Sequence, residues 1–503
     1  MNVAHLLDLH AHERPDAPAV VGGGGPLSWR ALRERVTRLA GGLAARGVAR
    51  GDRVAVLAAN DARYFEIYLA LAWLGALVVP LNTRLAPAEI ALQLADAEAR
   101  LWLVGDSLAA LADAVTPQPA RLALGDPSLL AGVPVDTSAA LVPEDTLGIF
   151  YTGGTTGLPK GVMLTHGNAL ANSRHVMRAI GYRAEDLHLH AAPIFHLADL
   201  GHLWAVALAG GAHAFVPSYS PETFCEAMER TRATVGVLAP AMVTALVRFA
   251  DLGMYDLSRW RVLVYGGSPI TEETLRRALA VLPCRLWQGY GQTEATHTVC
   301  FMTPEMHDLA LARPALARSC GRPIAGVEVR VVDADLDPVK PGESGEIVVR
   351  GPTVMKGYWK RPAETAEALA GGWLRTGDVA TVDADGFVYI LDRKKDMVIT
   401  GGENVYSVEV ENALASHPAV ADAGVIGVPD ETWGERVHAV VVLRPGSRAT
   451  PEELQAHCRR LIGGYKVPKT VEFAEALPRT PSGKIQKATL REPYWRGLSR
   501  KVS

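Results

Sequence analysis

The hydrophobic positions of the first hundred residues alternate between a helical and a strand pattern. Over residues 27–46 apolar side chains recur at helical spacing, and this segment begins at Ser28, a common N-cap residue, and stops at Gly47. The same alternation predicts helices over 65–74 and 87–97, and strands over 52–60, 76–81 and 100–104. Strands and helices that alternate at these intervals indicate βαβ units and a parallel sheet.

The alternation is interrupted once and then resumes. Residues 113–143 are rich in proline, alanine and glycine, so we expect a weakly structured connector there. Beyond it, apolar segments at 211–216, 235–238 and 262–264 predict further strands separated by helices. One of these helices is entered through Ser220-Pro221, with proline at the first helical position.

The pattern changes after residue 326. Short alternating segments at 327–332, 345–350 and 386–391 predict an antiparallel, barrel-like β subdomain. After a charged cluster at 392–396, a smaller α/β pattern follows, with a helix over 405–414, strands over 423–428 and 437–443, and a helix from Thr450 whose capping box is completed by Glu453. We place the domain boundary at Asp392. The predicted fold class is therefore α/β, with a large N-terminal domain over 1–391, which includes the β subdomain, and a small α/β C-terminal domain over 392–503.

Length and composition restrict the class of protein. A chain of 503 residues is too long for one core and should divide into at least two domains. Its net charge of −3 is close to balance, which argues against nucleic acid as a partner. The five cysteines lie far apart without a Cys-x-x-Cys pair, which argues against both a disulfide framework and a zinc site and fits a reducing cytoplasm.

The sequence also argues against secretion and membrane insertion. Residues 1–19 carry His, Asp, Glu and Arg before any long apolar run, unlike a signal peptide. The most apolar stretch, 68–81, is too short to span a bilayer and meets Pro80. We therefore interpret 68–81 as a buried helix that runs into a strand, and we expect a cytoplasmic protein without a transmembrane segment.

A glycine- and threonine-rich loop is the strongest chemical signal in the chain. Apolar residues at 147, 149 and 150 lead into Tyr151-Thr-Gly-Gly-Thr-Thr-Gly-Leu-Pro-Lys160, so we predict a buried strand that opens into this loop. Glycines let several N–H groups face one anion, threonines add hydroxyl donors, and a lysine adds a positive charge, so the loop suits phosphate. It is not a Walker A loop, because Pro159 precedes Lys160. An ordinary surface loop is the alternative.

Three further segments carry weaker signals. In Gln288-Gly-Tyr-Gly-Gln-Thr-Glu294, the tyrosine is able to stack on a base and the glutamate to hold Mg²⁺, although a turn with a solvated glutamate fits equally. Trp373-Leu-Arg-Thr-Gly-Asp378 ends in an acidic residue after a turn, which suits a ribose diol or any turn that contains aspartate. Pro478-Arg-Thr-Pro-Ser-Gly-Lys484 presents a lysine suited to developing negative charge, or simply an exposed lysine.

Together these motifs resemble the adenylate-forming superfamily, most closely its fatty-acyl and aryl acid CoA ligases. The resemblance covers essentially the whole chain. The motifs that carry it are the 152–160 loop, Pro193-Ile-Phe-His196, Tyr265-Gly-Gly-Ser268, Tyr290-Gly-Gln-Thr-Glu294, Thr376-Gly-Asp378, Asp392-Arg393, Gly401-Gly-Glu-Asn404 and Pro481-Ser-Gly-Lys484.

The resemblance implies the function of most site residues. Catalytic roles fall to Lys484, His196, Thr155 and Glu294, of which Thr155 and Glu294 bind Mg²⁺. Contacts with ATP or AMP fall to Thr152, Gly153, Gly154, Thr155, Thr156, Gly157, Lys160, Gly267, Ser268, Gln288, Gly289, Tyr290, Gly291, Thr293, Asp378 and Arg393. Asp392 is the implied hinge, and the implied CoA tunnel is lined by Gly401, Gly402, Glu403 and Asn404.

The implied acyl pocket leaves the substrate open. Its lining is Ala198, Asp199, His202, Gly266, Gly267, Ala295 and His297. The small residues admit an aliphatic chain or a flat ring, whereas the polar ones favour an aromatic or polar-substituted acid, unless they are satisfied core groups. If residues 198–204 begin a helix, Asp199 and His202 share a face, which we expect to look toward the acyl group.

Three functional hypotheses follow. The first is an acid:CoA ligase that uses ATP, Mg²⁺ and CoA to make acyl-AMP, pyrophosphate and then acyl-CoA. In the second, a carrier-protein thiol, an amine or another small nucleophile captures the acyl-AMP. The third is a catalytically silent nucleotide-binding homologue, because Gly153 stands where the family loop usually has Ser or Thr. The partners implied are the carboxylic acid, ATP and CoA, and the oligomeric state is left open, with a homodimer among the options.

Overall fold

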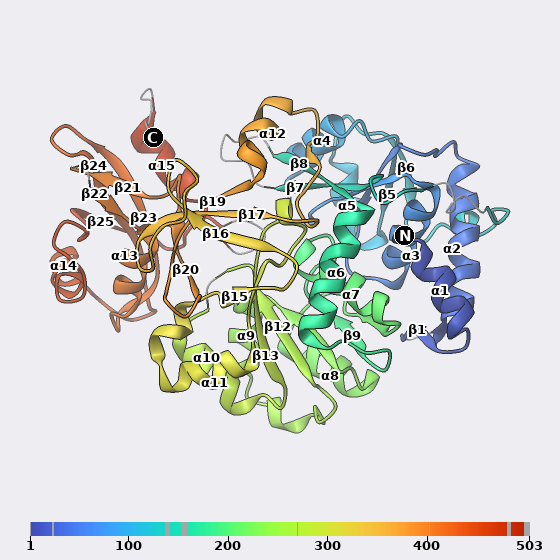
Figure 1. Cartoon of the computed structure of the whole chain (residues 1–503), viewed down its shortest axis with the longest axis horizontal. Coiled ribbons are helices and arrows are strands. Elements are labelled where there is room, and N and C mark those ends of the chain that lie inside the picture. The colour runs from blue at the N-terminus through green and yellow to red at the C-terminus, as the bar shows by residue number, and fades with distance from the viewer. Residues whose placement is uncertain are drawn as a thin grey trace. The chain divides into compact units, whose positions relative to one another are not determined.

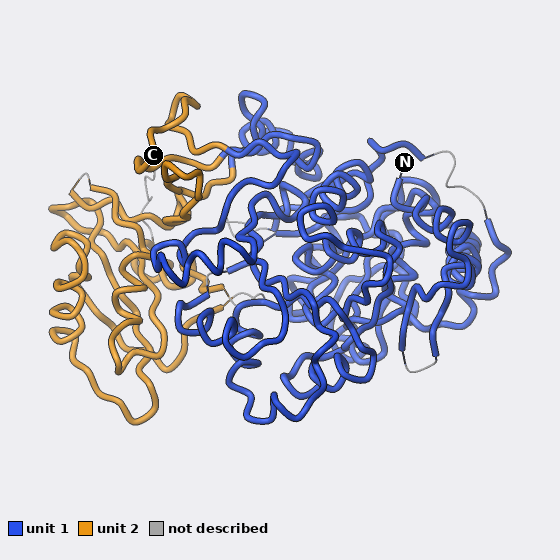
Figure 2. Tube along the Cα trace, turned by 60° about the horizontal axis from the view of Figure 1, so that its bottom comes forward, with its two compact units in different colours: residues 1–329, 348–375 blue, residues 330–347, 376–503 orange. Residues whose placement is uncertain are grey.

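The chain is described here from a computed structural model that covers residues 2–22, 25–135, 141–152, 159–268, 270–401, 403–479 and 484–496. The chain divides into two compact units, one of residues 1–329 with 348–375 and the other of residues 330–347 with 376–503 (Figure 2). Asp392 lies inside the second unit. The predicted boundary at that residue therefore stays a prediction.

One sheet of the first unit has the strand order β18-β8-β7-β4-β3-β5-β6. Its strands are β3 (Arg53–Leu57), β4 (Leu77–Pro80), β5 (Leu101–Val104), β6 (Ala120–Ala123), β7 (Thr146–Thr152), β8 (Lys160–Thr165) and β18 (Gly357–Tyr358). The strands from β7 to β6 are parallel, as predicted, and β8 returns antiparallel to β7. The weakly structured connector that we expected over 113–143 contains the short edge strand β6, which the sequence did not predict. That edge strand is mostly exposed, so its sequence lacks the apolar run that marks a buried strand.

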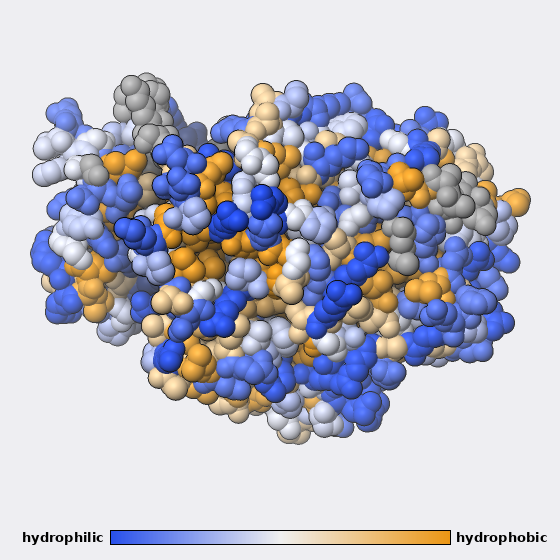
Figure 3. Space-filling model, viewed as in Figure 1, coloured by the Kyte–Doolittle hydropathy of each residue, from blue (hydrophilic) through white to orange (hydrophobic). Residues whose placement is uncertain are grey.

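Three of the helices near this sheet correspond to those predicted over 27–46, 65–74 and 87–97, and the other three were not predicted. The helices near the sheet are α1 (His5–Glu13), α2 (Trp29–Ala44), α3 (Ala62–Leu74), α4 (Pro87–Asp96), α5 (Ala109–Asp113) and α12 (Pro362–Ala368). Ser28 caps α2 by accepting a hydrogen bond from the Ala31 amide, and the surface around α1 and α2 is largely hydrophilic (Figure 3). The side chains of α3 are buried almost all round, and α3 leads into β4, which confirms a buried helix that runs into a strand.

A second sheet has the order β15-β14-β13-β12-β11-β9-β10-β1-β2. Its strands are β1 (Pro18–Val20), β2 (Leu27–Ser28), β9 (Leu187–His190), β10 (Ala212–Phe215), β11 (Val235–Leu238), β12 (Val262–Gly266), β13 (Arg285–Tyr290), β14 (Cys300–Met302) and β15 (Arg322–Pro323). Helix α6 (His166–Ile180) lies between β8 and β9 in the chain, and the helices that follow the strands of this sheet are α7 (Leu197–Ala209), α8 (Pro221–Thr231), α9 (Pro240–Val247), α10 (Glu272–Val281) and α11 (Pro304–Ala312) (Figure 1). Strands β9 to β13 are parallel, so their carboxyl ends meet at one edge of the sheet.

The predicted β subdomain corresponds to β16 (Glu328–Val332), β17 (Ser344–Arg350), β19 (Leu374–Val382) and β20 (Val388–Arg393), which hydrogen bond in that order. Each of β16, β17 and β19 contains a boundary between the two units. The sequence missed β19 and interpreted its first half as a turn. Gly377 has φ +69° and the ladder with β20 shifts register after Val379, and both features interrupt the alternation that marks a strand.

The remainder of the second unit is a small α/β domain. Its elements are β21 (Val398–Thr400), β22 (Glu403–Val405), α13 (Ser407–Ala415), β23 (Val420–Asp430), β24 (Gly434–Leu443), α14 (Pro451–Arg459), β25 (Thr470–Phe473) and α15 (Lys487–Trp495). Thr450 and Glu453 form the predicted capping box. The predicted fold class is confirmed. Within the ranges that the structure describes, no helix is long and apolar enough to cross a membrane.

Candidate active site

Tyr358 links two of the predicted site residues in the first unit. Its hydroxyl donates to Oε1 of Glu294 across 3.0 Å, and its ring centroid lies 4.9 Å from Nζ of Lys160. Lys160 is the first residue of β8 and pairs with Thr152, the last residue of β7. The two ends of the predicted phosphate loop are thus adjacent. The cation Lys160 lies at one end, and Tyr358 connects it to the carboxylate of Glu294.

The sequence did not predict Tyr358. It lies on the two-residue strand β18, which pairs with β8 through Tyr358 and Val162. The available signal was an aromatic residue after Gly357, but the pairing that places it beside Lys160 is distant in sequence. Residues 153–158 of the predicted loop, which include Gly153, Gly154, Thr155, Thr156 and Gly157, lie outside the described residues.

The predicted adenine-side residues lie at the carboxyl ends of two neighbouring strands. Gly266 of β12 pairs with Gly289 of β13, and a Cβ on Gly266 would lie 2.3 Å from the Gly289 carbonyl oxygen. Gly267 and Ser268 follow β12, and Gln288, Gly289 and Tyr290 end β13. In parallel sheets, ligands bind beyond the carboxyl ends of the strands. The predicted adenine-side residues thus lie at the edge of the sheet where ligands of parallel sheets bind.

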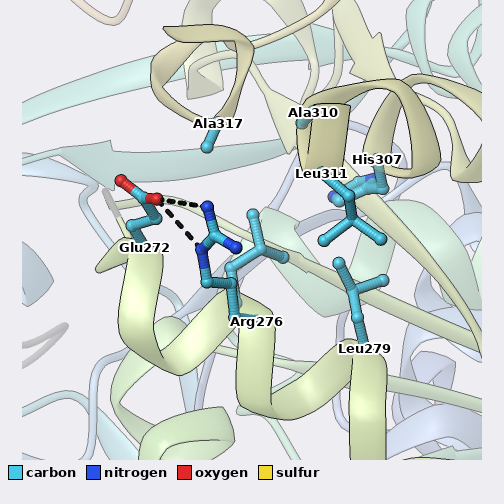
Figure 4. Close-up of a pocket in the computed structure, with 8 residues that line it drawn as sticks. Glu272, Arg276, Leu279, His307, Ala310, Leu311 and Ala317 are labelled. Atoms are coloured by element: carbon cyan, nitrogen blue, oxygen red, sulfur yellow. Dashed lines mark hydrogen bonds and ion pairs between the residues drawn. The ribbon is translucent and has the colours of Figure 1, made fainter. Parts of the chain in front are cut away.

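Tyr265, the first residue of the Tyr265–Ser268 motif, is held by two side chains. Its hydroxyl bonds Nε2 of His307 at 2.8 Å and lies 3.4 Å from Oε1 of Gln288. His307 also lines a small groove between α10 and α11, where Glu272 and Arg276 form an ion pair (Figure 4). Of the described residues, none that the sequence assigned to the site lines that groove. His307 thus connects the adenine-side strands to the helices behind them.

The residues around Glu294 lead directly to His297. Thr293, Glu294 and Ala295 form a single 3-10 turn, and Gly291 precedes it. Thr296 and His297 then adopt φ values of +66° and +142°, a conformation that costs about 1–3 kcal/mol at each non-glycine residue. Strain of this kind persists where the surrounding structure imposes it, often at functional sites.

The predicted acyl-pocket histidines contact each other. His202 lies on α7 with its ring edge-on to His297 at a centroid distance of 4.7 Å, and its Nδ1 bonds the Tyr182 hydroxyl at 2.9 Å. A Cβ on Gly201 would lie 2.9 Å from the His297 ring, so glycine makes room for it. Burial lowers the pKa of His297 to about 3 and the pKa of His202 well below its ordinary value, so both are neutral at pH 7.

Asp199 and His196 lie on the same helix in different surroundings. The expected helix is confirmed as α7, and exposed His196 caps it by accepting from the Ala198 amide at 3.1 Å. Asp199 is fully buried, and its carboxylate contacts the rings of His190 and His188. Although Asp199 and His202 are three residues apart on one helix, they have different partners: Asp199 contacts His190, and His202 bonds Tyr182. The place of Asp199 in the acyl pocket stays a prediction.

In the second unit, the two predicted ribose residues form an ion pair. Asp378 of β19 is paired in register with Arg393 of β20, and Nε of Arg393 lies 2.6 Å from Oδ1 of Asp378. Asp378 is buried and Arg393 is half-buried. Asp378 and the residues before it thus belong to a strand, where the sequence predicted a turn followed by the aspartate.

The predicted hinge residue Asp392 is buried and well bonded. Its Oδ2 accepts from the amide of Ser407 at 2.5 Å and from the Ser407 hydroxyl at 2.6 Å. Burial raises its pKa, although the charge of Lys487 and the bonds from Ser407 oppose that shift. Asp392 therefore ties β20 to the start of α13.

The remaining predicted residues lie on two exposed segments of the second unit. Lys484 follows the undescribed residues 480–483, and the adjoining chain is closed by a bond from the Gln486 amide to Pro478 O at 2.8 Å. Gly401 follows β21, Glu403 and Asn404 begin β22 and pair with Thr400 and Ile399, and Gly402 is not described. The sequence did not predict exposed Trp433, whose carbonyl accepts from the Gly401 amide at 2.8 Å.

Comparison with known proteins shows to which family the chain belongs. The family model "AMP-binding enzyme" matches residues 7–359, and "AMP-binding enzyme C-terminal domain" matches residues 409–484. The chain is 42% identical over 496 residues to feruloyl-CoA synthase of Amycolatopsis sp, which covers 96% of this chain and 97% of the relative. It is 36% identical over 508 residues to the fatty acid–[acyl-carrier-protein] ligase ScoC of Streptomyces coeruleorubidus, with 98% and 97% covered.

A solved structure agrees over the same length. The amide bond synthetase McbA from Marinactinospora thermotolerans superposes with a TM-score of 0.86 and 34% identity, covering 98% of this chain and 100% of McbA. The resemblance inferred from the sequence motifs is thereby confirmed. The chain belongs to the AMP-binding enzyme family, among the adenylate-forming enzymes related to acyl- and aryl-CoA ligases.

Proposed function

We infer that this chain is an ATP-dependent acid:CoA ligase. A carboxylate oxygen of the acid attacks the α-phosphorus of ATP, and the bond to pyrophosphate breaks, which leaves acyl-AMP. The thiol sulfur of CoA then attacks the acyl carbon, AMP leaves with the bonding electrons, and the thiol loses its proton. The observation that carries this proposal is the placement of Lys160 and Glu294 around Tyr358, beside the glycine- and threonine-rich loop.

Charge explains the roles that we propose in the first unit. Lys160 and the loop threonines, Thr152, Thr155 and Thr156, bind the phosphates of ATP. Mg²⁺, where bound, screens the phosphate charge, and Glu294 and Thr155 offer it the oxygen ligands that it prefers. Tyr358 engages one oxygen of Glu294 and so orients the carboxylate. The adenine lies against Gly267, Ser268 and the 288–291 segment, at the carboxyl ends of β12 and β13.

The second unit supplies the remaining groups. Asp378 accepts from the ribose hydroxyls, and Arg393 holds that carboxylate through their ion pair. Lys484 stabilises the negative charge that develops between the acid and the α-phosphate. We propose that rotation about Asp392 then removes Lys484 and brings residues 401–404 to the pantetheine chain, as the resemblance implies.

The acid that fits best is aromatic with a polar substituent. His202 and His297 are neutral, and only His202 bonds the Tyr182 hydroxyl, so both imidazoles are of a kind that donates to or accepts from a phenolic hydroxyl. The relative named feruloyl-CoA synthase supports this class. The lining that we propose for the acid is Ala198, His202, Gly266, Gly267, Ala295 and His297. His196 lies at the nucleotide end of this pocket. Asp199 contacts the imidazoles of His188 and His190.

Capture of the acyl-AMP by another nucleophile is the second candidate. It is favoured by the similarity to an acyl-carrier-protein ligase and to an amide bond synthetase. A panel of carboxylic acids in ATP–pyrophosphate exchange, with and without CoA, separates these functions. Exchange with acyl-CoA formation supports the ligase, exchange without it supports another acceptor, and no exchange with any acid supports a silent homologue.

A further inference from the structure

Three histidines and one aspartate meet in the interior of the first unit. His188 and His190 lie on β9, His213 lies on the adjacent strand β10, and Asp199 lies on α7. All four side chains are fully buried. One ring nitrogen from each histidine can be chosen so that the three lie within 4.8 Å of one another.

The sheet itself creates this cluster. Residues 188 and 190 are two apart on one strand, so their side chains point to the same face. His213 is paired in register with His188 in the parallel ladder, which places its side chain on that face too. Asp199 approaches from α7, and its Oδ1 contacts Nδ1 of His190 and lies 3.7 Å from Nε2 of His188.

The polar groups of the cluster are incompletely satisfied. His190 Nε2 bonds His213 Nδ1 at 3.0 Å. Among the described atoms, both ring nitrogens of His188, Nε2 of His213 and Oδ2 of Asp199 are buried without a hydrogen-bond partner. An unsatisfied buried polar group costs about 1–3 kcal/mol, so several together in one place require an explanation. A cation that accepts one lone pair from each imidazole satisfies several of these groups at once, although the second ring nitrogen of His188 would still need a partner.

The surroundings keep the imidazoles neutral and packed. The ring of Phe215 stacks on His190 and that of Phe65 lies against His213, both at centroid distances of 4.8 Å. Burial lowers the pKa of His190 to about 3 and the pKa values of His188 and His213 well below the ordinary value. Burial also raises the pKa of Asp199.

We propose that His188, His190, His213 and Asp199 form a structural binding site for Zn²⁺ that joins α7 to β9 and β10. Three imidazole nitrogens and one carboxylate oxygen make up a set that Zn²⁺ binds tetrahedrally, with metal–nitrogen distances of about 2.0–2.1 Å. To reach that geometry the contacts of His190 with Asp199 and His213 would lengthen, and the spacing of His188 to Asp199 would shorten. The spacing of the cysteines argued against a zinc site. That argument did not consider His188 and His190, which stand at alternate positions of one strand.

The proposed zinc site shares only Asp199 with the residues expected around the substrate. None of its three histidines was assigned to ATP, CoA or the acid, and a structural zinc site closed by four protein ligands leaves no position for a substrate. Its effect is to fix the helix that carries His196 and His202. The competing explanation is a metal-free hydrogen-bonded cluster completed by buried water.

The test measures metal in the untagged, full-length protein after gel filtration in chelator-treated buffer. We expect about one zinc per chain in the wild type, and less than about one tenth of that in His188→Gln and in His213→Gln, because each loses a ligand. Added Zn²⁺ should raise the Tm of the metal-stripped wild type and leave these variants unchanged. His166→Gln is the matched control, because His166 is a fully buried histidine outside the cluster.

Zinc-free wild type that also binds no added Zn²⁺ would overturn the proposal, and so would equal zinc content in the wild type and the folded cluster variants. If the variants do not fold, Co²⁺ titration of the wild type decides. A visible absorption band typical of tetrahedral cobalt that saturates at about one equivalent supports the site. A titration without such a band refutes it.

Discussion

The hydroxyl of Tyr358 lies 3.0 Å from Oε1 of Glu294 and donates a hydrogen bond to it. This bond ties β18 to the 3-10 turn that follows β13, two segments that are far apart in sequence. The face of the same ring lies against Lys160. One aromatic residue thus positions both the cation and the carboxylate that we assign to the phosphates and Mg²⁺ of ATP.

Tyr358→Phe keeps the ring and removes the bond to Glu294. A hydrogen bond to a charged group contributes about 1.5–3 kcal/mol, so we expect adenylation to slow by about 10- to 100-fold. The loss should be partly recovered at high Mg²⁺, because a less ordered carboxylate still binds the ion. ATP–pyrophosphate exchange measured across a Mg²⁺ series checks both effects.

Tyr389→Phe is the matched control, since the Tyr389 hydroxyl also bonds a carboxylate, Asp383, at 2.9 Å outside the proposed site. It should leave exchange unchanged. Wild-type exchange in Tyr358→Phe at every Mg²⁺ concentration would show that the bond to Glu294 has no part in adenylation.

Lys484→Ala should abolish adenylation and leave the thiolation of supplied acyl-AMP largely intact. The reason is that its charge acts only in the first transition state, before the proposed rotation. Pyrophosphate exchange and acyl-CoA formation from synthetic acyl-AMP measure the two steps separately. Lys469→Ala, which alters another exposed lysine of the second unit, is the control. Equal loss of both steps would contradict the alternation of the second unit.

Gly153→Ser tests the departure of the phosphate loop from its family. If the loop has the family geometry, the restored hydroxyl should lower the KM for ATP or raise the rate of adenylation, because it adds a hydrogen-bond donor to a charged phosphate. Steady-state exchange kinetics measure both quantities. A collapse of activity would instead indicate that this position needs a positive φ or close backbone approach, which only glycine tolerates.

His166 should make stability depend on pH. Burial lowers its pKa from 6.5 to about 4 in the folded state. As pH falls below 6.5 the unfolded chain takes up this proton first, so the stability contribution is present above that pH and is lost as pH falls toward 4. Urea midpoints of wild type and His166→Gln at several pH values should converge over this window as pH falls. A constant difference between them would contradict the linkage.

Local patterns in the sequence were enough to predict much of the fold. The starts of α2 and α14 were predicted from Ser28 and from the capping box of Thr450 and Glu453, because an N-cap acts through neighbouring residues. Strand β19 was missed because Gly377 and a register shift break its alternation. Edge strand β6 was missed because it is mostly exposed. Each miss is a place where the tertiary pairing, and not the local pattern, decides the structure.

The candidate site was predictable by residue but not by contact. Lys160 and Glu294 belong to motifs that can be recognised in the sequence, whereas Tyr358 joins them only through the pairing of β18 with β8. His188 and His213 come together only because β9 and β10 are parallel and in register. Such contacts depend on sheet order, which a single sequence does not specify.

The last prediction concerns the acid that the pocket accepts. His202 bonds the Tyr182 hydroxyl and packs edge-on against His297. His297 follows the 3-10 turn that contains Glu294, so His202 is tied to that part of the site. His202→Leu removes the polar edge and leaves the Tyr182 hydroxyl unpaired, which should cost about 1–3 kcal/mol of stability. We expect its preference to shift toward unsubstituted aliphatic or aryl acids, with the KM for ATP nearly unchanged.

Tyr182→Phe separates recognition from packing, because it breaks the same hydrogen bond and keeps the imidazole. Relative rates across a panel of hydroxylated, unsubstituted and aliphatic acids should change in His202→Leu and stay close to wild type in Tyr182→Phe. If both variants change the rates equally, the hydrogen bond acts by shaping the pocket. If neither does, His202 is a core residue with no part in selecting the acid, and a fatty acid becomes the substrate to test first.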